Sequence, residues 1–302
     1  MACGSGTDQT VAPDPATDPD LAANGIPTVL NENLHGATYN AAAGTLTLNM
    51  VSLDAGPVEA LYTRKPGLDV GPYQAYTNQD DPLDRHFTAL VAQSADPSRA
   101  VRAGVVADGG QFNRYFPGAF YERDGGFTPP SNTTGLVSYA GTYAGVTNVA
   151  STGSDLLAIP GPGPIDAGRT PRQSARTQGH IFLDVNFSDN SVNGNIINRT
   201  LIDSASAPAN AALPNVVLIR SEIDTNGEFL GTTEYDDHTP NGNYGGIFGG
   251  TDATAVGGII ALDSFDGPGD TLGYTTEQER GVFVLIQCGQ PGDDPICANV
   301  NP

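Results

Sequence analysis

The feature that most constrains the fold of this chain is a two-residue alternation of apolar side chains in short segments that end in turn residues. Ile181, Leu183 and Val185 alternate with Asp184 and Asn186, and a Ser-Asp-Asn-Ser turn follows before the chain returns. Because successive side chains of a strand point to opposite faces, this pattern predicts half-buried antiparallel strands joined by hairpins. We therefore expect an all-β protein.

The second half of the chain repeats this pattern between residues 135 and 288. The expected strands lie at 139–145, 180–187, 192–196, 215–224, 228–233, 244–250, 256–262 and 282–286. Within 215–224 we expect Val217, Ile219 and Ile223 to point inward. Eight short strands at hairpin spacing predict an eight-stranded antiparallel β-barrel, with a sandwich as the alternative, and closure into a barrel removes edges that aggregate.

Glycines alternate with aromatic residues in two of these segments, from Tyr139 to Gly145 and from Tyr244 to Gly250. Glycine weakens a strand, so regular placement calls for a structural reason. We expect each ring to lie beside an empty glycine position, which lets a narrow interior fill and lets the strands coil.

The first half is β-rich but less regular. Strand signals lie at 44–50, 58–63, 86–93 and 101–106, and residues 107–134 are rich in aromatic residues, glycine and proline. We place a domain boundary near Thr134, and we expect residues 159–174 to form a long loop.

The charge balance excludes several classes of function. The chain has 34 acidic and 13 basic residues, a formal net charge of −21. No basic stripe is left to displace counterions from phosphates, so we do not expect nucleic acid as a partner. No apolar run is long enough for a membrane-spanning helix. Solubility explains the acidic balance, and steering of a cationic partner or metal is the alternative.

The three cysteines fall into two groups. Cys3 precedes a segment without periodicity that reaches residue 24, and this start resembles the acylated cysteine of a bacterial lipoprotein; a free thiol is the alternative. Two acyl chains there give stable membrane anchoring. Cys288 and Cys297 flank a Gly- and Pro-rich loop, and we expect a disulfide that ties the C-terminal tail to the last strand, rather than a metal thiolate pair.

Three stretches of the second half resemble the C-terminal barrel domain of the transferrin-binding protein B family of surface lipoproteins. They are the Gly/aromatic strand at 135–143, the hairpin at 183–194 and the sequence GIFGGTDATAVGGII at 246–260, which is similar to the pattern G-x-F-x-G-x-x-A-x-x-x-G-G. The family's acidic residue shortly before the Gly-Gly pair is missing, since Ala255 and Val256 stand there.

The resemblance implies a flexible lipoprotein spacer at 1–24, a β-rich handle domain at 25–134 and an antiparallel barrel domain at 135–302. It also implies a lipid-anchored protein of the outer membrane, on the cell surface or the periplasmic face. Such a protein captures a protein, haem or a small solute, with an outer-membrane transporter as a further partner. One lobe stands where the transferrin receptor has two, so transferrin is not the expected ligand.

The densest aromatic and arginine stretch supplies the candidate binding residues. They are Phe112, Arg114, Tyr115, Phe116, Tyr121 and Arg123. Aromatic residues and arginine dominate binding hot spots, so an exposed stretch of this kind predicts a ligand-binding patch. The alternative is that these side chains are buried and pack the handle against the barrel.

Other candidate chemistry has simpler interpretations. The cluster Glu234–His238 offers ligands to a metal but also reads as an acidic hairpin loop, and any one of His35, His86, His180 and His238 could ligate haem. We assign no metal, cofactor or catalytic site, since no G-x-S-x-G, H-E-x-x-H or P-loop motif is present. The leading hypothesis is a binding protein and not an enzyme. A self-associating structural or adhesive surface protein and a secreted hydrolase with paired carboxylates are the alternatives.

Overall fold

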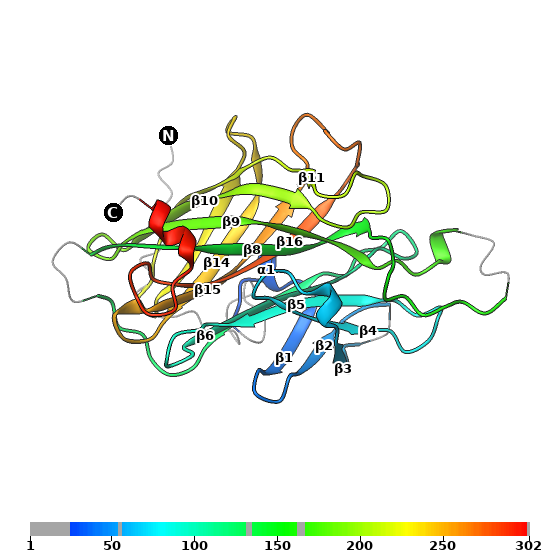
Figure 1. Ribbon diagram of the computed structural model, residues 1–302, viewed down its shortest axis with the longest axis horizontal. Coiled ribbons are helices and arrows are strands. Elements are labelled where there is room, and N and C mark those ends of the chain that lie inside the picture. Colours follow the sequence, from blue (N-terminus) through cyan, green and yellow to red (C-terminus); the bar gives the residue numbers. More distant parts are fainter. Residues whose placement is uncertain (1–24, 54–55, 131–134, 162–166, 301–302) are drawn as a thin grey trace, which may run out of the picture.

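The chain folds into two antiparallel sheets that are packed on each other (Figure 1). The computed structural model describes residues 25–53, 56–130, 135–161 and 167–300. Within these residues the first half of the chain forms one sheet and the second half forms the other, which confirms the all-β fold class. No helix among them is both long and apolar enough to cross a membrane.

The first sheet, which we call the handle sheet, has seven strands in sequence order. They are β1 (Leu34–Asn40), β2 (Thr45–Met50), β3 (Val58–Arg64), β4 (Gln74–Asn78), β5 (Phe87–Gln93), β6 (Val101–Asp108) and β7 (Gly118–Arg123). The short helices α1 (Thr28–Asn31) and η1 (Pro66–Leu68) precede β1 and β4. Glu32 beside β1 pairs with Gly118 of β7, so the sheet nearly closes on itself. The sequence pattern does not reveal β1, β4 and β7, because polar residues and glycine interrupt their alternation.

The second sheet is the predicted closed barrel of eight antiparallel strands. They are β8 (Leu136–Ala150), β9 (Ser174–Asn186), β10 (Ser191–Leu201), β12 (Val216–Glu222), β13 (Glu228–Glu234), β14 (Pro240–Gly249), β15 (Ala255–Asp263) and β16 (Gln278–Ile286). β8 pairs with both β9 and β16, which closes the barrel. The two-residue strand β11 (Ala211–Ala212) pairs with β10. The connections carry the 3-10 helices η2 (Ala167–Arg169), η3 (Thr251–Ala253) and η4 (Pro295–Asn299).

The predicted inward face of 215–224 is wrong at Val217 and Ile219 and right at Ile223, which is buried. In β12 the buried side chains are those of Val216 and Leu218, whereas Val217 and Ile219 are half-buried. Four apolar residues stand in a row there, so alternation alone cannot fix which pair points inward. Pairing with β10, which sets Val216 opposite Ile196, decides the face.

Rings lie over glycines of the neighbouring strand. Gly258 pairs with Phe283, and a Cβ built on Gly258 would lie 2.3 Å from the ring atom Cζ of Phe283. Gly231 pairs with Tyr244 in the same way, with Cε1 at 2.3 Å. The expected match of ring and empty position therefore operates across strands rather than along one strand.

Side chains fill the barrel interior. The ring of Phe248 lies 5.2 to 5.6 Å, between centroids, from the rings of Phe187, Phe229 and Tyr139. Deeper along the interior, the fully buried Arg199 and Glu279 form an ion pair at 2.7 Å. An eight-stranded barrel is just wide enough for its side chains, so a binding surface is expected on the outside of the molecule.

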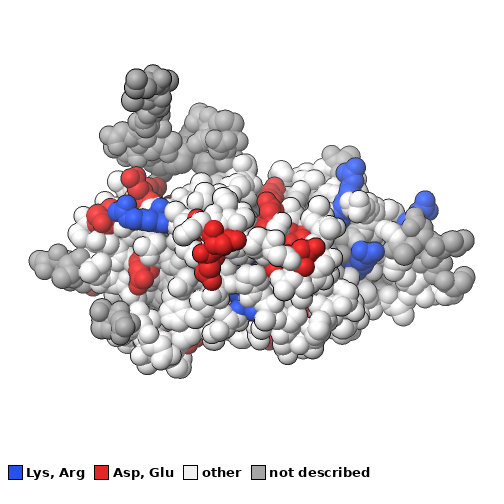
Figure 2. All heavy atoms as spheres, turned by 90° about the horizontal axis from the view of Figure 1, so that it is seen from above, with Lys and Arg blue, Asp and Glu red and all other residues white. Residues whose placement is uncertain are grey.

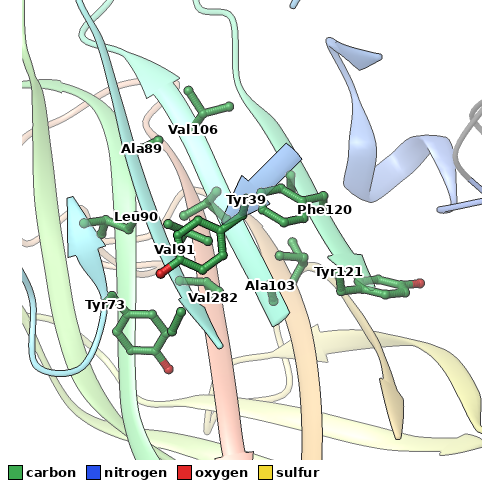
Figure 3. Close-up of a cluster of buried hydrophobic side chains, with 14 of the residues drawn as sticks. Tyr39, Tyr73, Ala89, Leu90, Val91, Ala103, Val106, Phe120, Tyr121 and Val282 are labelled. Atoms are coloured by element: carbon green, nitrogen blue, oxygen red, sulfur yellow. The ribbon is translucent and has the colours of Figure 1, made fainter. Parts of the chain in front are cut away.

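The handle sheet packs against the outside of the barrel. One hydrophobic core joins Ala103 of β6 to Val282 of β16 (Figure 3). Polar contacts cross the same boundary: the Tyr73 hydroxyl donates to the Thr142 carbonyl at 2.7 Å, and Arg280 Nε donates to Glu32 Oε2 at 2.8 Å. These contacts fix the handle sheet on the barrel.

Candidate functional site

A groove of about 430 Å³ opens in the handle sheet where β3 and β4 separate. We call it the handle groove. Its walls come from β3, from the connection between β4 and β5, and from the turn at 111–114. Val58, Ala60 and Tyr62 line it from β3, with Leu83 and Phe112 from the other two segments.

Exposed apolar side chains concentrate at this groove. Nine large hydrophobic side chains are exposed in the described residues, and four of them line it: Leu53, Val58, Leu83 and Phe112, each between 47% and 51% exposed. Contiguous exposed apolar surface marks interaction sites, whereas scattered single residues need no explanation. The handle groove is therefore the strongest candidate for ligand contact.

Phe112 is held at the groove by a strained turn. Its φ angle is 57° and that of Asn113 is 55°, so both lie in the left-handed region. Asn adopts this conformation readily and Phe seldom does, at a cost of about 1–2 kcal/mol. The Arg114 N–H closes the turn on the Gln111 carbonyl at 3.1 Å, and the Phe112 N–H donates to the Gly168 carbonyl at 2.7 Å. Such outliers persist where the surroundings hold them, which motivates a functional hypothesis.

Buried polar contacts brace the turn from below. Gln111, almost fully buried, donates through Nε2 to the carbonyls of Leu83 at 2.9 Å and Arg169 at 2.7 Å. Arg85 donates to the Gln111 carbonyl at 3.1 Å and pairs with Asp108. Burial raises the pKa of the Asp108 carboxyl, and the Arg85 guanidinium opposes this shift. The groove is thus held in a preformed shape.

Charges of both signs border the handle groove. Asp80 and Asp84 are exposed on one wall, and Arg114 is exposed beside Phe112. Arg172 is also exposed, and its carbonyl accepts the Gly109 N–H at 3.0 Å. Figure 2, which views the molecule from the barrel side, shows acidic side chains spread over that face and basic side chains at the end where the connection from β8 to β9 lies in Figure 1.

The structure does not bring the six predicted binding residues together on one surface. Phe112 is exposed at the groove and Arg114 is exposed two residues further on, whereas Phe116 and Tyr121 are buried. Tyr115 is half-buried, and its enclosed hydroxyl has no hydrogen-bond partner among the described residues.

The sixth residue, Arg123, joins the two sheets. Its Nη1 donates to the carbonyls of Asn226 at 2.6 Å and Phe248 at 2.8 Å. The alternative interpretation of this aromatic and arginine stretch, in which its side chains pack the handle against the barrel, therefore holds for Arg123.

Sequence reasoning missed Leu53, Val58 and Leu83. Leu53 and Leu83 are single large apolar residues between a turn residue and an aspartate, in the sequences Ser-Leu-Asp and Pro-Leu-Asp. An apolar residue isolated in a polar turn is the signal that could have identified them.

Cys288 and Cys297 form a disulfide, with an S–S distance of 2.05 Å. Together with the tail up to Val300 they border a hollow of about 740 Å³ against β8, β9 and β10. This hollow is larger than the handle groove, but only Leu136 among its lining residues is a large exposed hydrophobic side chain. Cys3 lies outside the described residues.

A buried carboxyl pair bears on the hydrolase alternative. Asp266 and Glu277, 1% and 4% exposed, border a hollow of about 690 Å³ at one end of the barrel. Burial and the contact with Asp266 raise the pKa of Glu277 to about 7, and Asp266 Oδ2 also accepts the Leu272 N–H at 3.0 Å. Glycosidase carboxyls stand at least about 5 Å apart with sugar between them, so this contacting pair is better explained as structural.

The candidate metal and haem ligands do not converge. His238 Nδ1 lies 2.7 Å from Glu234 Oε1, and this contact raises the pKa of His238. His86 is buried, and its Nε2 lies 3.1 Å from Asp155 Oδ2. In the part of the chain that the structure describes, no group of three or more His, Cys, Asp or Glu side chains could hold a metal ion.

Comparison with known proteins gives matches among solved structures alone. No protein-family model and no curated protein matches the chain. A structure of intact Ap-TbpB, with N and C lobes, matches at 12% identity over 83% of this chain and 45% of that one, with a TM-score of 0.38. Transferrin-binding protein B from serogroup B Neisseria meningitidis matches at 14% identity over 83% and 51%, with a TM-score of 0.32.

A crystal structure described as a surface lipoprotein matches at 13% identity over 86% of this chain and 99% of that one, with a TM-score of 0.35. The chain spans about half the length of the two transferrin-binding proteins above. The two transferrin-binding proteins belong to the family that the sequence motifs resemble. At such identities and TM-scores the fold assignment rests on the strand pairing itself.

Proposed function

We propose that this chain is a surface binding protein that captures a protein ligand through the handle groove, without catalysis. The observation that carries the proposal is the strained turn that presents Phe112 at a groove already lined by Leu53, Val58 and Leu83. Preformed, partly exposed apolar anchors are what a protein partner buries when it binds.

A protein fits this groove better than haem or a small solute. Pockets for small ligands enclose most of the ligand behind buried walls. Here the apolar side chains stand half-exposed around an open groove, with Asp80 and Asp84 exposed at its border. An apolar centre with a polar rim is the usual anatomy of a protein interface.

The location we propose is the outer membrane, with a lipid anchor on Cys3 and the spacer 1–24 between anchor and handle. The domain limits 25–134 and 135–302 belong to the same proposal, as does delivery of the captured ligand to an outer-membrane transporter. Mass spectrometry of natively isolated protein tests the anchor, because acylation of Cys3 adds the mass of its acyl chains.

Retention of ligand on the immobilised chain tests the function. Host serum and growth medium are passed over the wild type, over a Phe112→Ser/Leu83→Ser variant and over Leu230→Ser, which removes an exposed apolar side chain from the barrel. We expect wild type and Leu230→Ser to retain the same protein, and the groove variant to lose about tenfold or more of it.

Equal retention by all three proteins would refute the groove as the site. Retention of a chromophore without protein would favour a haem or solute carrier. Concentration-dependent assembly of the purified chain, measured by sedimentation, would instead favour the adhesive alternative.

A further inference from the structure

The strands that border the handle groove pair incompletely. β2 with β3, and β4 with β5, each pair through five residues, whereas β3 and β4 pair through two, Thr63↔Thr77 and Arg64↔Tyr76. Beyond these two pairs the strands separate, and residues 58–62 have no neighbouring strand on the β4 side within the described residues.

The alternation of antiparallel pairing identifies the unpaired backbone groups. The Lys65 N–H donates to the Ala75 carbonyl of β4 at 2.8 Å. The backbone groups of odd-numbered residues in β3 therefore point toward the β4 side. By the same period, the N–H and C=O groups of Leu61 and Glu59 point toward the gap. Within the described residues no backbone group pairs with them there.

The side chains of β3 alternate between the groove and the opposite face of the sheet. Val58, Ala60 and Tyr62 line the groove, while Glu59 and Leu61 are exposed on the opposite face. A strand edge of this kind offers hydrogen bonds to a backbone and contacts to every second side chain of an added segment.

We propose that an extended segment of the captured protein enters the handle groove and adds to the free edge of β3 as a further strand. This inference rests on the proposed function and specifies how the partner binds. A helix satisfies its own backbone and would leave the groups of Glu59 and Leu61 unpaired. The segment has apolar side chains at alternate positions, and Asp80 and Asp84 favour Lys or Arg on the side that faces them.

A proline placed on the edge separates backbone from side-chain effects. Leu61 stands opposite Thr47 in the pairing of β2 with β3, and the two-residue period directs its N–H away from β2, so Leu61→Pro removes a donor on the unpaired side. Leu61→Ala is the matched control, since it removes the side chain and keeps the N–H. We expect both variants to melt within a few degrees of each other and Leu61→Pro alone to lose binding.

The probe is a synthetic peptide selected from a random phage-displayed library on the full chain. Only peptides that bind wild type and not Phe112→Ser are kept, so that the groove is the site under test. We expect Leu61→Pro to weaken peptide binding about tenfold relative to Leu61→Ala, as the loss of one or two backbone hydrogen bonds predicts.

Methylation of single peptide nitrogens provides a readout on the unmodified protein. Nitrogens that face β3 should lose binding when methylated and the intervening ones should not, which gives a two-residue period. Uniform or absent sensitivity along the peptide, a selected peptide that binds as a helix, or a library without any such binder would overturn strand addition.

The two proposals fail in different ways. If serum-protein capture is lost in the Phe112→Ser/Leu83→Ser variant but is the same in Leu61→Pro and Leu61→Ala, the function stands and strand addition is wrong. If the groove variant captures its ligand normally, both proposals are wrong.

Discussion

Gly258 has no side chain because the ring of Phe283 on the next strand occupies that space. A Cβ there would lie 2.3 Å from Phe283 Cζ and 2.4 Å from the Gly245 carbonyl oxygen. The ring can move only into an interior that is already filled, and the carbonyl belongs to the sheet. The pairing of a glycine with an aromatic ring on the neighbouring strand is thus a packing rule of the barrel.

Gly258→Ala should therefore destabilise the protein by about 1–3 kcal/mol, the usual effect of overpacking a core. Gly269→Ala is the control, since a Cβ there meets no atom within 4 Å. Denaturant unfolding of both variants measures the effect, and equal stability would show that the barrel repacks freely around Gly258.

The ion pair inside the barrel makes a second prediction at this scale. Arg199 and Glu279 are both inaccessible to solvent, whereas the pair Arg220 and Asp189 is more than half exposed. Arg199→Met leaves a buried carboxylate without its partner and should cost about 3–5 kcal/mol. Arg220→Met should cost less than about 1 kcal/mol.

A double variant, Arg199→Met/Glu279→Met, keeps this prediction testable if the single variant does not fold. Replacing both charges by apolar groups restores much of the stability that one substitution removes. If Glu279→Met lowered the free energy of unfolding of the Arg199→Met variant as much as it lowers that of the wild type, the account would be contradicted.

At the scale of elements, the connection between β15 and β16 holds a buried carboxyl whose pKa is raised. Glu277, just before β16, has a pKa near 7 against an ordinary value of 4.5, because it is buried against Asp266 in that connection. The fold favours its protonated form. That contribution is complete below pH 4.5 and is lost as the pH rises to about 7.

Glu277→Gln keeps a neutral side chain with a donor at every pH. We expect the variant to melt about 2–4 °C above the wild type when the pH is well above 7. At pH 4.5, where Glu277 is protonated in the fold, the difference should vanish. Melting curves at the two pH values measure this, and a lower melting temperature of the variant above pH 7 would contradict the raised pKa of Glu277.

The strands of the barrel could be predicted from the sequence, but the handle groove could not. Alternation and turn residues are local, so the strands of the barrel are predictable from the sequence. The same pattern leaves a sandwich open, and closure into a barrel is what the family resemblance implies. The handle groove is not, because it exists where β3 and β4 stop pairing, which no local pattern records. The placement of Phe112 likewise depends on contacts of its turn with Leu83, Gly168 and Arg169, far away in the sequence.

For the molecule as a whole, the filled barrel and the open handle have different roles. The barrel interior holds rings and a buried ion pair, and the handle sheet is fixed to its outer face by Tyr73, Arg123 and Arg280. The rigid barrel thus supports a sheet whose open end carries preformed apolar anchors. A protein built in this way has the features of a binding module.

Site-specific photocrosslinking tests most directly whether the handle groove, and not the barrel, binds the ligand. A photoreactive phenylalanine analogue replaces Phe112 at the handle groove in one protein and Leu230 on the barrel in another. Both are exposed to host serum, illuminated and analysed by mass spectrometry. The account predicts covalent capture of one serum protein through position 112 and none through position 230; capture through position 230 alone would contradict it.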